Sequence, residues 1–161
     1  MTHDPLIDRA AASHGLDPAL VRAVVAAESG GDTFAIRYEP RFFDRYVQSD
    51  PTVKARTPCT LETEKRARAT SWGLMQVMGS TARGLGFDRA FLSRLSDPET
   101  GLEYGCRYLA RLAGLHRQRL GWPGVVAAYN AGSPRLDAQG DYVNQAYVDN
   151  IARLLGGTWP Q

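Results

Sequence analysis

Apolar residues recur every three or four positions along much of this chain, which is the spacing of amphipathic helices. The clearest example lies between Asp17, a capping residue followed by proline, and Gly30, with a stripe of leucine and valine between them. A similar capping pair at Asp97 begins the longest predicted helix, which Gly121 ends. Shorter helices are predicted over residues 5–14, 40–47, 60–69, 80–85, 123–129 and 147–155.

The stretches between these helices are rich in turn-forming residues, notably residues 50–58 and 132–140. They are too short to link separately folded units, and no internal repeat is present. We therefore predict an all-α protein, an irregular helical bundle in which residues 1–161 form one domain. The helix over residues 60–69 is so polar that we expect a solvated arm with little core of its own.

Composition narrows the class of protein. The 161 residues are 43% hydrophobic and 22% charged, as in a soluble globular protein, and the longest apolar stretches are too short for a membrane helix. The net charge is only +2, with basic residues scattered along the chain, so no nucleic-acid partner is indicated. Asp4, Asp8 and Arg9 stand where a signal peptide would carry its apolar segment.

No metal or cofactor is indicated either. His3, His14 and His116 are far apart and lack metal-ligand spacing, and no glycine-rich phosphate loop precedes a helix. Cys59 and Cys106 would form a disulfide only if they met in space. We expect two buried free thiols.

Glu28 is the most informative departure from the helical pattern, because it falls at the end of the apolar stripe that should face the core. Burial beside apolar groups raises the pKa of a carboxyl group, which allows it to hold and donate a proton near neutral pH. Periodicity alone favours the alternative, a glutamate near a helix end that reaches solvent.

Three short motifs favour a functional role for Glu28 over simple solvent exposure, and they follow one another along the chain. They are AAESG at residues 26–30, GLMQV at residues 73–77 and AYNAG at residues 128–132. Over roughly Leu6 to Leu155 the chain resembles the catalytic domain of the soluble lytic transglycosylases, whose lysozyme-like fold also includes goose-type lysozyme. The resemblance implies a glycan-binding cleft and peptidoglycan as the partner, with no cofactor.

The resemblance also implies roles for individual residues. Glu28 corresponds to the single catalytic acid and base of the family, and Ser29 to a residue that hydrogen-bonds near the cleavage site. Met75 and Gln76 correspond to residues that line the cleft. Gln76 is the stronger candidate, because core packing explains Met75 equally well.

Further positions follow from the third motif. Tyr129 is expected to hold the glutamate in place, and Asn130 to contact an acetamido group of the substrate. Tyr147 matches a further family tyrosine near the end of the domain, although a core tyrosine would fit the pattern nearly as well.

The activity implied is cleavage of the β-1,4 bond between N-acetylmuramic acid and N-acetylglucosamine, with formation of a 1,6-anhydro end. The distance from Glu28 to Gly73 departs from the commonest family pattern and indicates an inserted loop or arm over residues 36–71. A second carboxylate there would activate water and make the protein a hydrolytic muramidase. Glu39 is preferred over Asp32 and Asp44, although an ion pair with a neighbouring arginine explains Glu39 equally well.

A rival from another class is a catalytically silent glycan-binding or structural module. We expect a monomer that acts on the bacterial cell wall, in the periplasm or outside the cell. A phage or prophage lysin released from the host cytoplasm is the favoured source.

Overall fold

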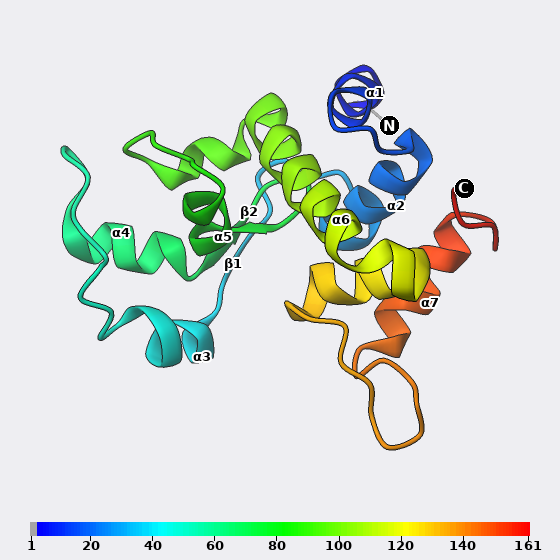
Figure 1. Cartoon of the computed structure of the whole chain (residues 1–161). Helices are drawn as coiled ribbons and strands as arrows, with labels where there is room; N and C mark the ends of the chain where they lie inside the picture. The colour runs from blue at the N-terminus through cyan, green and yellow to red at the C-terminus, as the bar shows by residue number, and fades with distance from the viewer. Residues whose placement is uncertain (1–2) are drawn as a thin grey trace.

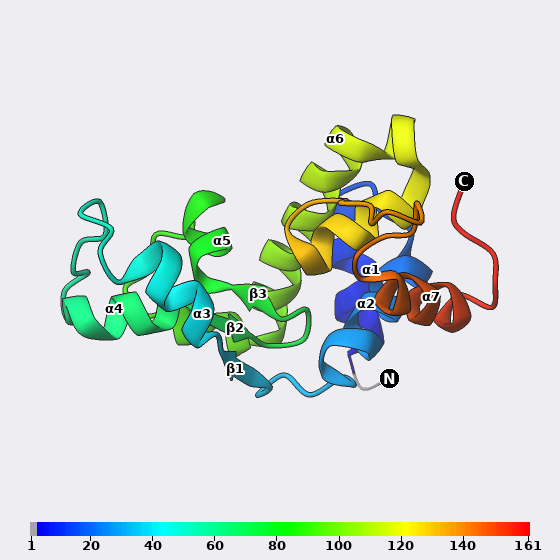
Figure 2. The same ribbon diagram turned by 90° about the horizontal axis from the view of Figure 1, so that it is seen from below.

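The computed structural model describes residues 3–161 and shows a mainly helical protein with two lobes, joined along the long helix α6 (Figure 1). The expected helical class is confirmed. The larger lobe consists of α1 (Asp4–Ser13), α2 (Pro18–Ser29), α7 (Gln145–Leu154) and most of α6 (Pro98–Ala131). Seen from below, the smaller lobe extends away from these helices (Figure 2).

Helix α2 begins and ends as its sequence predicts. The Asp17 carboxylate accepts a hydrogen bond from the backbone N–H of Ala19 at 2.7 Å. Gly30 ends the helix in the left-handed conformation, with φ at 62°, which glycine adopts without steric cost. Leu20, Val21 and other apolar residues of α2 are buried in the main core, where α2 packs against α1 and α7.

Helix α6 is interrupted at Gly121, where the sequence predicted a boundary between two helices. Gly121 has φ 64° and ψ −171°, which is far from helical geometry, and Pro123 follows in the next turn. The second part of the helix runs back into the core, where it buries Val125 and Val126.

A small antiparallel sheet lies where the two lobes meet, and the sequence pattern did not predict it. Its strands β1 (Ile36–Tyr38), β2 (Thr70–Trp72) and β3 (Val77–Met78) are adjacent in that order. The register places Arg37 opposite Ser71, and Ser71 opposite Met78, so these three residues form one cross-strand row. Strands of two or three residues are too short to show an alternating pattern.

The smaller lobe has a second, modest hydrophobic cluster formed by Phe43, Val47, Val53 and Ala69. Around it lie α3 (Pro40–Phe42), the π-helix η1 (Phe43–Val47), α4 (Leu61–Arg68), α5 (Gly79–Gly84) and the 3-10 helix η2 (Leu92–Ser96). Thr60 caps α4 by accepting a hydrogen bond from Thr63 N. Helix α5 begins at Gly79, one residue before the predicted start, and has no side-chain cap.

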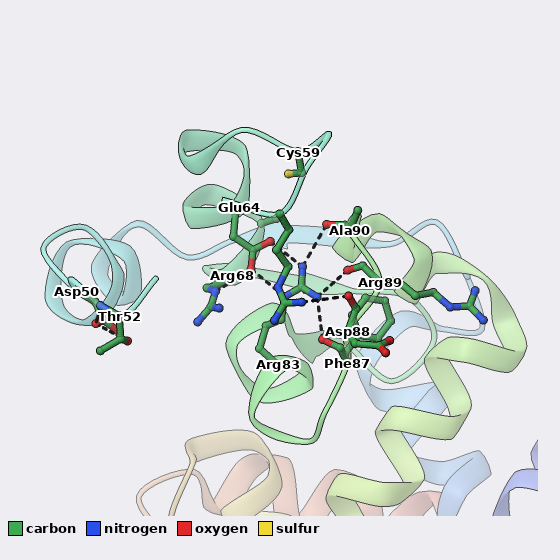
Figure 3. A network of polar contacts seen from close by, with 12 residues as sticks. Asp50, Thr52, Cys59, Glu64, Arg68, Arg83, Phe87, Asp88, Arg89 and Ala90 are labelled. Carbon is green, nitrogen blue, oxygen red and sulfur yellow. Dashed lines mark hydrogen bonds and ion pairs between the residues drawn. The ribbon is translucent and has the colours of Figure 1, made fainter. Parts of the chain in front are cut away.

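Helix α4 is not the solvated arm that its composition predicted. The Glu64 side chain is only 1% exposed and forms ion pairs with Arg83 at 2.7 Å and Arg68 at 2.8 Å (Figure 3). Arg83 also donates to the backbone carbonyls of Phe87, Arg89 and Ala90. This buried network joins α4 to α5 and to the loop that leads to η2.

Burial raises the pKa of Glu64, but the hydrogen bonds from Arg83 and Arg68 outweigh it and hold the pKa below its usual value. The carboxylate is therefore ionised, as its two arginine partners require. A sequence pattern records only a polar helix here, since the partner Arg83 lies 19 residues away.

Cys59 and Cys106 are both buried and are not joined to each other, in agreement with free thiols. Burial raises the pKa of the Cys106 thiol to about 12, so it stays neutral. No helix of residues 3–161 combines the length and the apolar character needed to cross a bilayer.

Candidate active site

A cleft of about 340 Å³ lies between the two lobes. Its helical wall is formed by residues of α2 and α6 and by the turn after α6, namely Glu28, Tyr108, Tyr129, Asn130, Ala131 and Gly132. Its opposite wall is formed by the sheet and adjoining segments, namely Arg37, Glu39, Phe42, Ser71, Gln76, Val77, Met78 and Thr81. The three sequence motifs all reach this cleft, although they are far apart in the chain.

Glu28 occupies the last turn of α2, and its partly buried side chain lines the cleft. Burial raises the pKa of Glu28, while a hydrogen bond from Tyr147 and the positive charge of Arg37 partly oppose this. The net pKa lies above its ordinary value. A carboxyl group in this environment is suited to hold a proton and release it to a ligand in the cleft.

Tyr147, on α7, holds Glu28. Its hydroxyl donates to Glu28 Oε1 at 2.7 Å. Burial raises the pKa of Tyr147, so the hydroxyl stays protonated and remains a donor. The contact fixes the position of one carboxyl oxygen of Glu28, and this also defines the orientation of the other oxygen.

Tyr129 does not hold the glutamate, contrary to the expectation from the resemblance. Its hydroxyl donates to the backbone carbonyl of Met75 at 2.8 Å. It lies close enough to Glu28 for the negative charge of that carboxylate to contribute to the raised pKa of Tyr129, after the larger effect of burial. Tyr129 therefore ties α6 to the segment before β3 and forms part of the cleft wall.

Ser29 and Met75 shape the site from behind, without lining the cleft. Ser29 Oγ donates to the backbone carbonyl of Leu74 at 2.8 Å, which attaches the end of α2 to the second motif. The Met75 side chain is fully buried, against Gly105 of α6, where an added Cβ would lie 2.3 Å from Met75 Sδ. Of the two explanations that the sequence allowed for Met75, core packing is the one observed.

Gln76 faces the cleft in a conformation that its neighbours enforce. Its φ of 46° is the one positive value found for a non-glycine residue within residues 3–161. The side-chain nitrogen donates to the carbonyls of Ala35 at 2.9 Å and Gly73 at 3.0 Å. The Oε1 atom has no partner in the described part of the chain, so it can accept a hydrogen bond from a ligand.

Asn130 lies at the cleft end of α6, with its side-chain oxygen accepting a hydrogen bond from Asn144 at 2.9 Å. Asn144 also donates to the carbonyl of Ala127, which orients it. The Asn130 amide nitrogen is thus directed away from Asn144 and has no acceptor in residues 3–161. Asn144 was not a sequence candidate, because it lies outside the three motifs.

Of the three carboxylates considered as second catalytic groups, Glu39 alone lines the cleft. It forms an ion pair with Arg37 at 2.5 Å, which was the alternative explanation for Glu39. Asp32 closes a local turn by accepting a hydrogen bond from Phe34 N, and Asp44 is exposed on η1. The cleft thus contains a second carboxylate, and that carboxylate already has a cationic partner.

Tyr108 and Arg37 are among the cleft residues that were not sequence candidates. Tyr108 packs against Tyr129, with ring centroids 5.2 Å apart and the rings tilted by 45°, and its helical spacing is that of an ordinary core residue. Arg37 entered the sequence analysis only as a neighbouring arginine that could form an ion pair with Glu39. Trp72 lies beside the second motif but does not line the cleft, and its indole N–H donates to the carbonyl of Ala67.

Within residues 3–161, no three histidine, cysteine or acidic side chains are grouped so as to hold a metal ion. The site therefore offers one carboxyl group with a raised pKa, a positioning tyrosine, and amide groups on either side. This arrangement is suited to proton transfer on an extended polar ligand.

A comparison with solved structures found no significant match. A family model described as the transglycosylase SLT domain matches residues 5–151, which is nearly the whole chain and includes all three motifs. The chain therefore belongs to the transglycosylase SLT domain family.

Proposed function

We propose that this protein is a lytic transglycosylase that cleaves the β-1,4 bond between N-acetylmuramic acid and N-acetylglucosamine, with Glu28 as the single acid and base. Family membership supports the coarser statement, a transglycosylase type of protein that acts on peptidoglycan of the cell wall. The observation that carries the finer proposal is Glu28, partly buried in the interlobe cleft, held by Tyr147 and with a raised pKa.

The first step uses the proton of Glu28. Glu28 donates it to the glycosidic oxygen as the bond from that oxygen to C1 of the muramic acid breaks. The 2-acetamido group of the same sugar stabilises the positive charge that develops at C1, as in substrate-assisted glycosidases. Asn130, with its free amide nitrogen, is the proposed contact for an acetamido group.

The second step returns the proton. The 6-hydroxyl of the muramic acid attacks C1, and the ionised Glu28 accepts the hydroxyl proton. The product has a 1,6-anhydro ring, and no water is consumed. Gln76 is proposed to bind the sugar through its free side-chain oxygen, and Tyr129 to form the wall against which the reacting sugar lies.

A hydrolytic muramidase is the second candidate, and one observation favours it: Glu39 is a carboxylate in the same cleft. It would act by deprotonating water for attack on C1. The ion pair with Arg37 counts against this role, because one carboxylate oxygen of Glu39 already accepts a hydrogen bond from Arg37 Nε.

The experiment that tests the proposal is mass spectrometry of the muropeptides that the protein releases from purified peptidoglycan. We expect anhydro products, about 18 mass units lighter than the hydrolysis products. Glu28→Gln should release none while keeping its circular dichroism spectrum, and Glu62→Gln, an exposed glutamate on α4, should behave as the wild type.

Other outcomes separate the alternatives. Products with reducing ends would contradict transglycosylation and favour the muramidase. Absence of release by the wild-type protein, together with retained binding to glycan strands, would favour a catalytically silent module. Equal release by Glu28→Gln would remove Glu28 from its proposed role.

A further inference from the structure

Among residues 3–161, Arg37 is the only positively charged residue that lines the cleft, where Glu28 and Glu39 both carry carboxyl groups. Recognition of a neutral polysaccharide needs no cation, whereas an anionic group on a ligand would need one to offset the repulsion from those carboxylates. The two chemical steps assign no role to Arg37, whose observed interactions are the ion pair with Glu39 and an electrostatic effect on Glu28.

The sheet directs Arg37 into the cleft. Arg37, Ser71 and Met78 form one cross-strand row, and all three line the cleft. Strand β3, at one edge of the sheet, packs against α6, and β1 is the opposite edge strand. The row therefore leads outward from the helical wall, and Arg37 stands at its outer end, where side groups of a bound strand would project.

The existing partner of Arg37 engages only part of the guanidinium group. Arg37 Nε donates to Glu39 Oε1 at 2.5 Å, and the terminal nitrogens have no acceptor in the described residues. Four N–H groups are therefore available, in the planar geometry that matches a carboxylate. The Arg37 side chain is 70% exposed, so its ion pair with Glu39 is weak and can be shared or exchanged at little cost.

We propose that Arg37 is a specificity-determining residue that binds a carboxylate carried by the muramic acid side chain of the substrate. The inference rests on the proposed function, because it names a feature of that substrate. Every muramic acid bears a lactyl group, which either ends in a free carboxylate or is joined by an amide bond to a stem peptide with carboxylates of its own. The shared chemistry is a carboxylate on the side chain of the sugar.

The test measures binding in the Glu28→Gln background, so that no ligand is cleaved. Isothermal titration calorimetry compares three ligands of equal length: strands with stem peptides, strands without them, and stem-free strands whose lactyl carboxylates have been converted to neutral methylamides. In this background we compare Arg37→Gln, which removes the positive charge, with Arg37→Lys, which keeps the charge but lacks the planar guanidinium group. Arg41→Gln is the matched control, because Arg41 is exposed on the neighbouring α3 and does not line the cleft.

We expect Arg37→Gln to weaken binding of a carboxylate-bearing strand roughly threefold to tenfold. Binding of the neutral methylamide strand should be unchanged, Arg37→Lys should retain part of the affinity, and Arg41→Gln should retain all of it. Loss confined to stem-bearing strands would assign the contact to the peptide, and loss confined to stem-free strands would assign it to the lactyl group.

Equal affinity of Arg37→Gln and its parent for all three ligands would overturn the inference, and so would an equal loss for all three. Absence of binding by the parent would overturn it as well. The proposed function has a separate test, because it would be contradicted if the wild-type protein released no muropeptides. If it fails while Arg37→Gln still shows the selective loss, Arg37 serves a glycan-binding module instead.

Discussion

The Tyr147 hydroxyl donates a 2.7 Å hydrogen bond to the Glu28 carboxyl group, although the two residues are 119 positions apart in the chain. The contact joins the last helix to the end of α2 at the cleft. It favours the ionised form of Glu28, in opposition to burial, and so sets how strongly the carboxyl group holds its proton.

Tyr147→Phe removes this donor and keeps the ring. The pKa of Glu28 should rise further, because a hydrogen bond to the ionised form is lost. The first step requires protonated Glu28, so the alkaline limb of the pH profile of kcat/KM should move to higher pH. We expect kcat/KM at neutral pH to fall roughly tenfold from loss of positioning. A pH profile with an unmoved or lower alkaline limb would contradict this role.

Ionised Glu28 should lower the free energy of unfolding at neutral pH. Its pKa is higher in the folded protein than its ordinary value of 4.5, so the folded state binds the proton more tightly. The free energy of unfolding therefore decreases as the pH rises above that ordinary value, and the cost is complete above the folded pKa. Glu28→Gln removes this cost and should raise the Tm more at about pH 8 than at about pH 4.

Thermal melts of both proteins at the two pH values provide the measurement. Glu62→Gln is the control at both pH values, because the Glu62 side chain is 66% exposed. A Glu28→Gln variant that is less stable than the wild type at the higher pH would contradict the raised pKa.

Glu64→Gln should destabilise the smaller lobe by about 3 kcal/mol, because it leaves the buried Arg83 without its counter-charge. Urea denaturation followed by circular dichroism measures this loss. Glu62→Gln, which breaks an exposed pair with Arg66 on the same helix, should change the free energy of unfolding by less than about 1 kcal/mol.

The loss of stability caused by Glu64→Gln should also depend on pH. Its pKa is lower in the folded protein, so its contribution is complete above the ordinary value and is lost as the pH falls through the folded pKa. The difference between the wild type and Glu64→Gln should therefore shrink in acid. A constant difference would argue that Glu64 contributes through packing alone.

Glu39→Gln separates the two proposed activities. In a transglycosylase Glu39 takes no part in bond cleavage, so the variant should still release anhydro products, with kcat/KM within roughly fivefold of the wild type. The muropeptide assay measures both quantities. A loss of about a hundredfold or more, together with reducing ends in the wild-type products, would make Glu39 the base of a hydrolase.

Sequence analysis was most successful where the chemistry is local. The start of α2 at Asp17-Pro18, its end at Gly30 and the break in α6 at Gly121 depend on one or two residues each, so the pattern predicted them correctly. Periodicity alone favoured a Glu28 that reaches solvent, and its side chain is instead partly buried. The motifs indicated the family, which the family model confirms.

Sequence analysis was less successful where a residue acts through distant partners. Glu64 lies on a helix whose composition resembles a solvated surface, and only the fold brings Arg83 to it. Tyr129 and Tyr147 are both tyrosines near the family motifs, and nothing local distinguishes the one that contacts Met75 from the one that contacts Glu28.

The sequence alone therefore determined the helical class and the main helix boundaries, because periodicity and capping are local properties. Only the tertiary structure decided which tyrosine holds Glu28, that Met75 is core, and that a three-stranded sheet directs Arg37 into the cleft. Those contacts join segments many residues apart, and the packing of the two lobes selects them.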